Sequence, residues 1–322
     1  MLGNLISLVV LVGIIVLLAW LTRRAWRSKR APVKWVGVVA AGTLTLLCTL
    51  GTLVVAKGFF DLYRPYPVAE AHVSIAGTPE QIARGEQLAA FLCASCHSPN
   101  GELPLSGGGN LSQESGLPLG DIYAPNITPA GRIQHLSDAD IFRILRTGVD
   151  PDGRLTAMGF FPVRHLSDDD ASAIIAYLRQ APAVEGAPPP LNPSPLFLAF
   201  TGLGLVKADA ATAQIQPVSA PPRAATKEYG EYVTNFGACR DCHGAALDGV
   251  APPPAPPGAP NLTLIMPQWS QEDFFRAMRT GVDPTGRQLN ALMPWKNIGK
   301  LDDVELAAMY EYLHSLTPVA AN

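Results

Sequence analysis

Two short Cys-x-x-Cys-His sequences constrain this chain more than any other feature. The first runs from Cys93 to His97 and the second from Cys239 to His243. Two thiols one helical turn apart can form thioethers with the two vinyl groups of one haem, and the adjacent histidine can then ligate the iron. The pattern therefore predicts two covalently bound haem c groups. Their thioether sites are Cys93, Cys96, Cys239 and Cys242, and their proximal iron ligands are His97 and His243.

Three other chemistries use paired cysteines, and the sequence context disfavours each. A thioredoxin-like thiol site would lie in a βαβ pattern, and no such pattern surrounds either pair. A zinc site built from two C-x-x-C pairs separates them by about 15–20 residues, whereas Cys239 follows Cys96 by 143 positions. Disulfide bonds would not require a histidine after each pair.

The two motifs lie in a segment that is duplicated. Residues 146–154 (RTGVDPDGR) match residues 279–287 (RTGVDPTGR) at an offset of 133. Residues 124–128 (APNIT) match 259–263 (APNLT), and a Gly-Glu pair precedes the cysteines in each copy, at 85–86 and 230–231. Three matches in the same order predict two homologous domains. We place them at residues 79–182 and 226–322.

Each repeat is predicted to end in a helix. In the first, Ser167 is a suitable N-cap, three aspartates follow it, and apolar residues recur from Ala171 to Leu178 at helical spacing. In the second, Asp302 is the expected N-cap, and the apolar stripe begins at Leu306. Neither repeat has the alternation of a β-strand, so we predict an all-α fold.

A methionine thioether is the expected second axial ligand of each iron. Met158 is the candidate in the first repeat, where His135 and His165 are the alternatives. Met293 is the candidate in the second repeat, because it follows the repeated Gly-Arg as Met158 does. The second repeat also contains Met266, Met278 and Met309, of which the last two lie in apolar helical stripes.

Two further pairs of repeated residues have candidate functional roles. Arg154 and Arg287 are candidate partners of the haem propionates, since a guanidinium binds a carboxylate through two hydrogen bonds. A role in stabilising the local turn is an equally good interpretation of these arginines. For Asn126 and Asn261 we favour a turn over a contact with the haem edge.

The first 60 residues have the pattern of a membrane anchor. They contain seven Lys and Arg and no Asp or Glu. Residues 5–21 and 35–56 are uncharged and apolar, and each is near the ~20 residues that a membrane-spanning helix needs. The basic stretch between them predicts a cytoplasmic loop, which places both termini on the outer face. A cleaved signal peptide is the competing interpretation, but its positive charge would precede the apolar stretch.

These features divide the chain into five parts. Residues 1–60 form a two-helix transmembrane anchor and residues 61–78 a linker. The domains at 79–182 and 226–322 are separated by a Pro-rich linker at 183–225, which we expect to be extended and free of helix. Its apolar stretch at 196–206 is too short to span a membrane and is expected to pack on a domain or to touch the membrane surface.

The two repeats resemble class I cytochrome c domains. The second contains CRDCH, PNLT, GVDPTGR, MPW and a closing helix with MYEYL, and the first contains CASCH, IYAPNITP, GVDPDGR and AIIAYLR. The chain is similar to cytochrome subunits of membrane-bound alcohol and sugar-acid dehydrogenases, and more so to bacterial membrane-anchored dihaem cytochromes c. The resemblance implies a haem in a hydrophobic crevice and assembly on the outer side of the cytoplasmic membrane. The first repeat departs at Met158, where the family has Met directly before Pro.

The resulting hypothesis is a membrane-tethered electron carrier rather than an enzyme. An iron held by His and Met has no open position for a substrate. The expected partners are respiratory or photosynthetic membrane complexes, small soluble redox carriers and membrane lipid. Nucleic acid is not expected, because the net charge is −3. The alternative is a dihaem enzyme, peroxidase-like or thiosulfate-oxidising, with one open haem, and Met158 marks where we would look for it.

Overall fold

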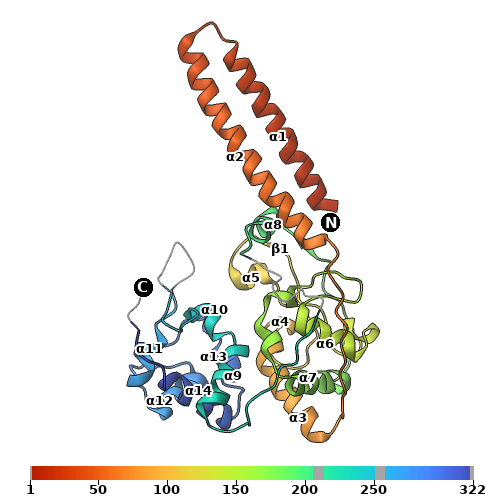
Figure 1. Ribbon diagram of the computed structural model, residues 1–322, viewed down its shortest axis with the longest axis vertical. Helices are drawn as coiled ribbons and strands as arrows, with labels where there is room; N and C mark the ends of the chain where they lie inside the picture. Colours follow the sequence, from red (N-terminus) through yellow and green to blue (C-terminus); the bar gives the residue numbers. More distant parts are fainter. Residues whose placement is uncertain (1, 206–213, 251–257, 320–322) are drawn as a thin grey trace.

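The computed structural model describes residues 2–205, 214–250 and 258–319. Within these ranges the chain is mostly helical, which confirms the predicted all-α class. The short exceptions are β1 (Gly120–Asp121) and β2 (Asn192–Pro193), which pair antiparallel. Figure 1 shows a long helical hairpin that projects from the side of α8 and the first repeat.

The hairpin consists of α1 (Leu2–Trp26) and α2 (Ala31–Tyr63), which pack against each other. Both helices are long and apolar enough to cross a membrane by length and composition. The first has 25 residues and is therefore about 37 Å long, which exceeds the ~30 Å hydrocarbon core. The second continues three residues past the predicted end of the anchor, and Asn4 donates to the Tyr63 hydroxyl at 3.3 Å where the two helices meet the rest of the chain.

A helix in the Pro-rich linker corrects one expectation. We predicted no helix in residues 183–225, but α8 (Pro195–Gly202) forms there and packs against α2. Proline is tolerated because Pro195 occupies the first helical position, where its missing N–H has no intrahelical partner to lose, and Ser194 caps the helix. Close approach of the backbones requires two glycines: a Cβ at Gly58 would overlap the Leu198 carbonyl, and one at Gly202 would overlap the Val54 carbonyl.

The first repeat is built on a pair of crossed helices, α3 and α7. Both predicted features of α7 are confirmed, since Ser167 caps it and the apolar stripe is buried. A Cβ at Gly85 would overlap the Ala173 carbonyl, which explains why the repeated Gly-Glu pair begins with glycine. The elements of this repeat are α3 (Pro79–Leu88), η1 (Ala89–Cys93), α4 (Ala94–His97), α5 (Leu111–Ser115), β1, η2 (Arg132–His135), α6 (Asp138–Thr147), η3 (Ala157–Phe160), η4 (Pro162–His165) and α7 (Asp168–Gln180).

The second repeat has the same helix pair, α9 with α14. Gly230 lies against the Ala308 carbonyl as Gly85 lies against that of Ala173, and Asp302 is the N-cap of α14 as predicted. The elements of this repeat are α9 (Lys227–Phe236), α10 (Cys239–His243), α11 (Leu262–Ile265), η5 (Met266–Gln268), α12 (Gln271–Thr280), α13 (Trp295–Ile298) and α14 (Asp303–His314).

The segments outside the repeats pack closely on the first one. Ala69, in the segment predicted as the first linker, is only 1% exposed, and its carbonyl accepts a hydrogen bond from Arg143 Nε at 2.6 Å. In the second linker, Val218 exchanges two hydrogen bonds with Asp168 at the start of α7. The first repeat is therefore tied to the hairpin on one side and to the following segment on the other.

Candidate functional site

The first Cys-x-x-Cys-His segment forms at a change of helix type. The chain passes from α3 through one π-helical turn, η1, which ends at Cys93, and into the short α4 that contains Cys96 and His97. Cys93 and His97 are both buried, and His97 keeps 7% of its surface exposed. The segment therefore holds two thiols one helical turn apart, with an imidazole directly after the second, as thioether attachment with an adjacent iron ligand requires.

A backbone carbonyl orients the imidazole of His97. Its Nδ1 lies 2.8 Å from the carbonyl oxygen of Pro125. Because a carbonyl oxygen only accepts, Nδ1 carries the proton and Nε2 keeps its lone pair. Burial lowers the pKa of His97, which favours this neutral form. The histidine is therefore prepared to bind a metal through Nε2, with its other nitrogen already held.

The second segment repeats this arrangement. Cys239 to His243 form α10, and Ala238, before it, adopts a left-handed conformation with φ of 63°. The Nδ1 of His243 lies 2.9 Å from the carbonyl oxygen of Pro260, and burial lowers the pKa of this histidine too. The two repeats thus present the same donor set, and that set fits a covalently bound haem in each.

The repeated asparagines do more than form turns. The Asn126 Oδ1 accepts from the Thr128 amide at 2.9 Å, which is the expected turn. The Asn126 Nδ2 also donates to the carbonyls of Val184 and Gly186, which follow the closing helix. Asn261 donates in the same way to the carbonyl of Val319. Each asparagine therefore fastens the proline-containing loop that orients the histidine to the end of its own repeat.

The repeated RTGVDPxGR sequences form equivalent turns. Each begins with a left-handed glycine that ends a helix, Gly148 after α6 and Gly281 after α12. Asp283 Oδ1 accepts the backbone amides of Thr285 and Arg287, at 2.9 and 3.0 Å, and Asp150 accepts two amides at the corresponding positions. The Thr285 hydroxyl and these amide hydrogen bonds lower the pKa of Asp283 to about 2.

Both candidate methionines follow these turns at equivalent places. Met158 lies in η3 and Met293 lies directly before Pro294 and α13. Both are half-buried and pack against the main apolar cluster, which also includes Cys93 and Cys239. The alternatives for the first repeat, His135 and His165, are exposed. Met158 therefore packs against the same apolar cluster as Cys93, and its role as an iron ligand stays a prediction.

The two candidate arginines lie at the surface. Arg154 is 76% exposed and pairs with Asp152 at 3.3 Å, while Arg287 is 78% exposed and pairs with Asp283 at 3.1 Å. Their partners in the structure are therefore carboxylates of their own turns. A propionate contact for either arginine stays a prediction.

Burial opposes ionisation of the thiols of Cys93, Cys239 and Cys242. Cys93, Cys239 and Cys242 are not in disulfides. Burial raises the pKa of the Cys93 thiol to about 12, and that of Cys239 to about 12, whereas reactive thiols have lowered pKa values. In the part of the chain that the structure describes, no group of three or more His, Cys, Asp or Glu side chains is arranged to hold a metal ion.

Sequence reasoning missed the prolines at 125 and 260. Each proline contributes a main-chain carbonyl, which every residue has, so the residue type does not reveal this role. A signal was nevertheless present, because the Ala-Pro-Asn sequence recurs after each Cys-x-x-Cys-His motif. Sequence reasoning also missed the ion pair between Arg84 of the first repeat and Glu305 of the second, whose Nη1 and Oε1 atoms lie 2.5 Å apart.

Comparison with known proteins agrees with this geometry. A family model described as cytochrome c matches residues 82–182 and 228–317. The fructose dehydrogenase cytochrome subunit of Gluconobacter japonicus is 29% identical, over 73% of this chain and 52% of that protein. The cytochrome c subunit of alcohol dehydrogenase (quinone) from Gluconobacter oxydans (strain 621H) is 28% identical, over 62% of this chain and 47% of that protein.

A third relative matches a shorter stretch. The gluconate 2-dehydrogenase cytochrome c subunit of Pantoea cypripedii is 33% identical, over 28% of this chain and 23% of that protein. This chain spans about half the length of the fructose and alcohol dehydrogenase subunits and less of the gluconate dehydrogenase subunit.

Proposed function

The chain belongs to the cytochrome c family, and we propose that it is a membrane-tethered electron-transfer protein that carries two haem c groups. The observation that carries this proposal is the matched pair of Cys-x-x-Cys-His segments, each with its histidine Nδ1 bound to a loop carbonyl. Haem c, when bound, supplies one-electron exchange at its iron.

The residues of each repeat have distinct tasks. Cys93 and Cys96 would hold one haem by thioethers, and Cys239 and Cys242 would hold the other. His97 and His243 would ligate the irons through Nε2, because their Nδ1 atoms are already engaged. Met158 and Met293 are the proposed second axial ligands, supported by their half-buried positions beside the apolar cluster. If His and Met side chains of the protein both bound each iron, no position would be left for a substrate, and the sites would suit electron exchange.

The apolar cluster around both sites also matters for this task. It contains the buried aromatic and aliphatic side chains of both crossed helix pairs and reaches Cys93 and Cys239. Such an environment excludes water from the ligands and holds each donor in one orientation, so that little rearrangement is needed when the charge of the site changes.

The partners are proposed from the relatives and from the anchor. The relatives are named as cytochrome subunits of fructose, alcohol and gluconate dehydrogenases, so a dehydrogenase is a suitable class of electron donor. A respiratory or photosynthetic membrane complex, or a small soluble redox protein, is the proposed acceptor. The helices α1 and α2 support a location in the bacterial cytoplasmic membrane, with the haem domains on the outer side.

The haem count tests this proposal. The full chain should retain two haems through denaturation and acetone extraction, because thioethers survive both treatments. The variant Cys93→Ala/Cys96→Ala should lose one haem, as should Cys239→Ala/Cys242→Ala, measured by haem staining and intact mass. Cys48→Ala is the matched control and should keep both haems, since Cys48 lies in α2. A wild-type chain without covalently bound haem would refute the proposal.

A further inference from the structure

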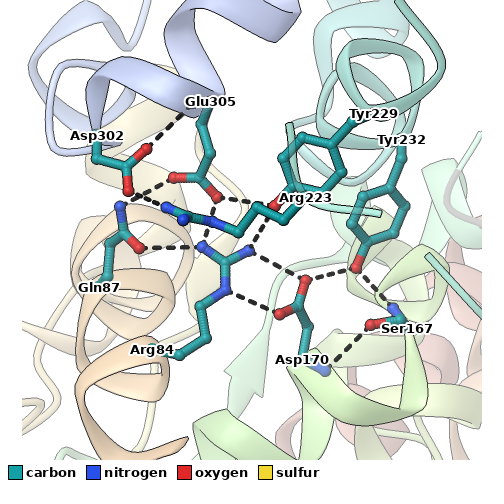
Figure 2. Close-up of polar contacts among 9 residues, drawn as sticks. All are labelled: Arg84, Gln87, Ser167, Asp170, Arg223, Tyr229, Tyr232, Asp302 and Glu305. Atoms are coloured by element: carbon teal, nitrogen blue, oxygen red, sulfur yellow. Dashed lines mark hydrogen bonds and ion pairs between the residues drawn. The ribbon is translucent and has the colours of Figure 1, made fainter. Parts of the chain in front are cut away.

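The two repeats meet through their crossed helix pairs. Figure 2 shows nine side chains at this contact, contributed by α3 and α7 of the first repeat and by α9 and α14 of the second, with the residues just before these helices. We call them the interdomain network; they are Arg84, Gln87, Ser167, Asp170, Arg223, Tyr229, Tyr232, Asp302 and Glu305.

Equivalent positions of the two repeats face each other in this network. Arg84 directly precedes Gly85, and Tyr229 directly precedes the matching Gly230. The same comparison pairs Gln87 with Tyr232, both two positions after the glycine. Asp170 and Glu305 correspond as well. Asp170 lies three positions before Ala173, whose carbonyl contacts Gly85, and Glu305 lies three positions before Ala308, whose carbonyl contacts Gly230. The contact therefore uses the same face of both repeats, as in a twofold-symmetric dimer.

The cross-repeat hydrogen bonds are reciprocal. The Gln87 Nε2 of the first repeat donates to Glu305 of the second at 2.9 Å. At the corresponding positions, the Tyr232 hydroxyl of the second repeat donates to Asp170 of the first at 2.7 Å. Each repeat thus supplies a donor to the carboxylate of the other.

Apolar contact continues the same arrangement. The rings of Phe91 and Phe236, each six positions after its helix glycine, meet edge to face with centroids 6.1 Å apart. The two phenylalanines belong to one apolar cluster that contains core residues of both repeats. The repeats therefore share a continuous core and do not merely touch at their surfaces.

Arg84 is the charged centre of the network. It donates to Asp170 of its own repeat at 2.8 and 3.1 Å, and to Glu305 of the other at 2.5 Å. Glu305 is fully buried, and the Arg84 side chain is 16% exposed. Burial alone would lower the pKa of Arg84, but Asp170 and Glu305 together raise it, so the cation is held firmly.

Two tyrosines complete the hydrogen bonding of these charges. The Tyr229 hydroxyl accepts from Arg84 at 3.2 Å and donates to Glu305 at 3.4 Å, and burial raises its pKa to about 12. The Tyr232 hydroxyl accepts from the Ser167 amide at 2.8 Å. Beside them, Arg223 pairs with the Asp302 cap of α14. Each buried carboxylate therefore has partners from both repeats.

We propose that Arg84 is a positioning residue that locks the two cytochrome c domains into one rigid pair with a fixed relation between their haem sites. Because the lock concerns the haem sites, this inference rests on the function proposed above. Removal of the guanidinium would leave two buried carboxylates without their cation, which is strongly destabilising.

The locked arrangement brings the two ligand-bearing regions together. The segment η4 follows Met158 in the first repeat and packs against α9 of the second. The helix α13 follows Met293 in the second repeat and packs against η1 of the first, which ends in Cys93. Lys300 of the second repeat also donates to the Gly101 carbonyl, in the loop after His97, at 2.5 Å. The relation between the two ligand-bearing regions therefore depends on a contact that Arg84 holds closed.

The test compares single and double variants of the full haem-loaded chain in detergent. Arg84→Gln is expected to raise amide hydrogen-exchange rates in α3 and α9 on the order of 100-fold, and to change the Soret circular dichroism, which reports the mutual orientation of two haems. Adding Glu305→Gln should recover part of both effects, because it removes one of the stranded charges. A role confined to folding of the first repeat would give no such recovery.

The matched control is Arg279→Gln, which breaks an ion pair with Asp303 inside the second repeat. It should leave the Soret dichroism and the exchange rates of α3 unchanged. The inference is overturned if Arg84→Gln behaves like this control, or if Glu305→Gln brings no recovery. Haem content measured on every variant separates the two proposals: missing covalent haem in the wild type refutes the proposed function, whereas two haems with an unaltered interface refute the lock alone.

Discussion

A main-chain carbonyl orients each of the two histidines that are proposed to ligate the irons. The carbonyls of Pro125 and Pro260 occupy equivalent loops, and Asn126 and Asn261 fasten those loops to the ends of their repeats. The orientation of the imidazole therefore depends on the loop conformation more than on the residue that carries the carbonyl. Replacement of the asparagine is then expected to disturb the histidine more than replacement of the proline.

The distal ligands give the first prediction at the residue scale. Met293→His should keep the second haem low-spin and lower its reduction potential, because an imidazole favours ferric iron more than a thioether does. Met158→Ala should allow carbon monoxide to bind at the first haem. Redox titration and carbon monoxide difference spectra measure these changes. Binding of carbon monoxide or peroxide by the wild type would instead support the peroxidase-like alternative.

Asp283 gives a prediction about pH. Its pKa in the folded protein is about 2, below the ordinary value of 3.8. Between these values the unfolded chain binds more protons, so stability rises with pH there. The contribution is fully present above pH 4 and is lost as the pH falls through 2. The thermal stability of the wild type relative to Asp283→Asn should therefore be greater at pH 5 than at pH 2.5. An equal difference at both pH values would contradict the assignment.

At the element scale, glycines set how closely the helices approach. Gly85 and Gly230 lie against carbonyls of the closing helices in the two repeats, and Gly58 and Gly202 join α2 to α8. In each case the neighbouring atom belongs to a backbone, which cannot rotate away as a side chain can. The α2–α8 contact, together with Leu198 and Phe197 buried beneath it, connects the hairpin to the chain after the first repeat.

This contact predicts a selective effect of Gly58→Leu. The added side chain should separate α8 from α2 at a cost of about 1–3 kcal/mol, the range for overpacked contacts. Limited proteolysis in membranes should then cleave residues 183–205 faster than in the wild type. Gly51→Leu is the matched control on the same helix, because a Cβ at Gly51 meets nothing within 4 Å. Equal cleavage of the two variants would show that the contact does not hold α8.

At the scale of the whole molecule, the first repeat connects the hairpin of α1 and α2 to the second repeat. Residues 61–78 pack along it, with Ala69 buried, and the chain after α7 returns to α8 at the base of the hairpin (Figure 1). The second repeat is attached through the interdomain network. We therefore expect the described parts of the two repeats to move as one body together with the base of the hairpin.

Topology is the prediction that belongs to this scale. Both repeats should lie outside the cytoplasmic membrane, since the basic residues between α1 and α2 favour the cytoplasmic side. A protease added to the outer face of intact spheroplasts should degrade or release the haem-stained part of the chain. Protection of that part, with cleavage in residues 27–30 between the helices, would place the repeats inside and reverse the proposed orientation.

Features that depend on neighbouring residues could be predicted from the sequence. The Cys-x-x-Cys-His segments, the caps Ser167 and Asp302, and the apolar helices α1 and α2 are all specified within a few turns of chain. The expectation that the Pro-rich linker contains no helix was wrong. Pro195 occupies the first helical position, where a proline costs the helix no hydrogen bond.

Contacts between distant residues were decided by the tertiary structure alone. Arg84 and Glu305 are 221 positions apart, and neither belongs to a motif, so nothing local indicates that they meet. The carbonyls that hold His97 and His243 are likewise invisible in residue type, because every residue has one. Duplication of the domain produced two similar faces. Only the contact of α3 and α7 with α9 and α14 determined that these faces meet each other. The physical reason is that burial of apolar surface and pairing of charge depend on position in space.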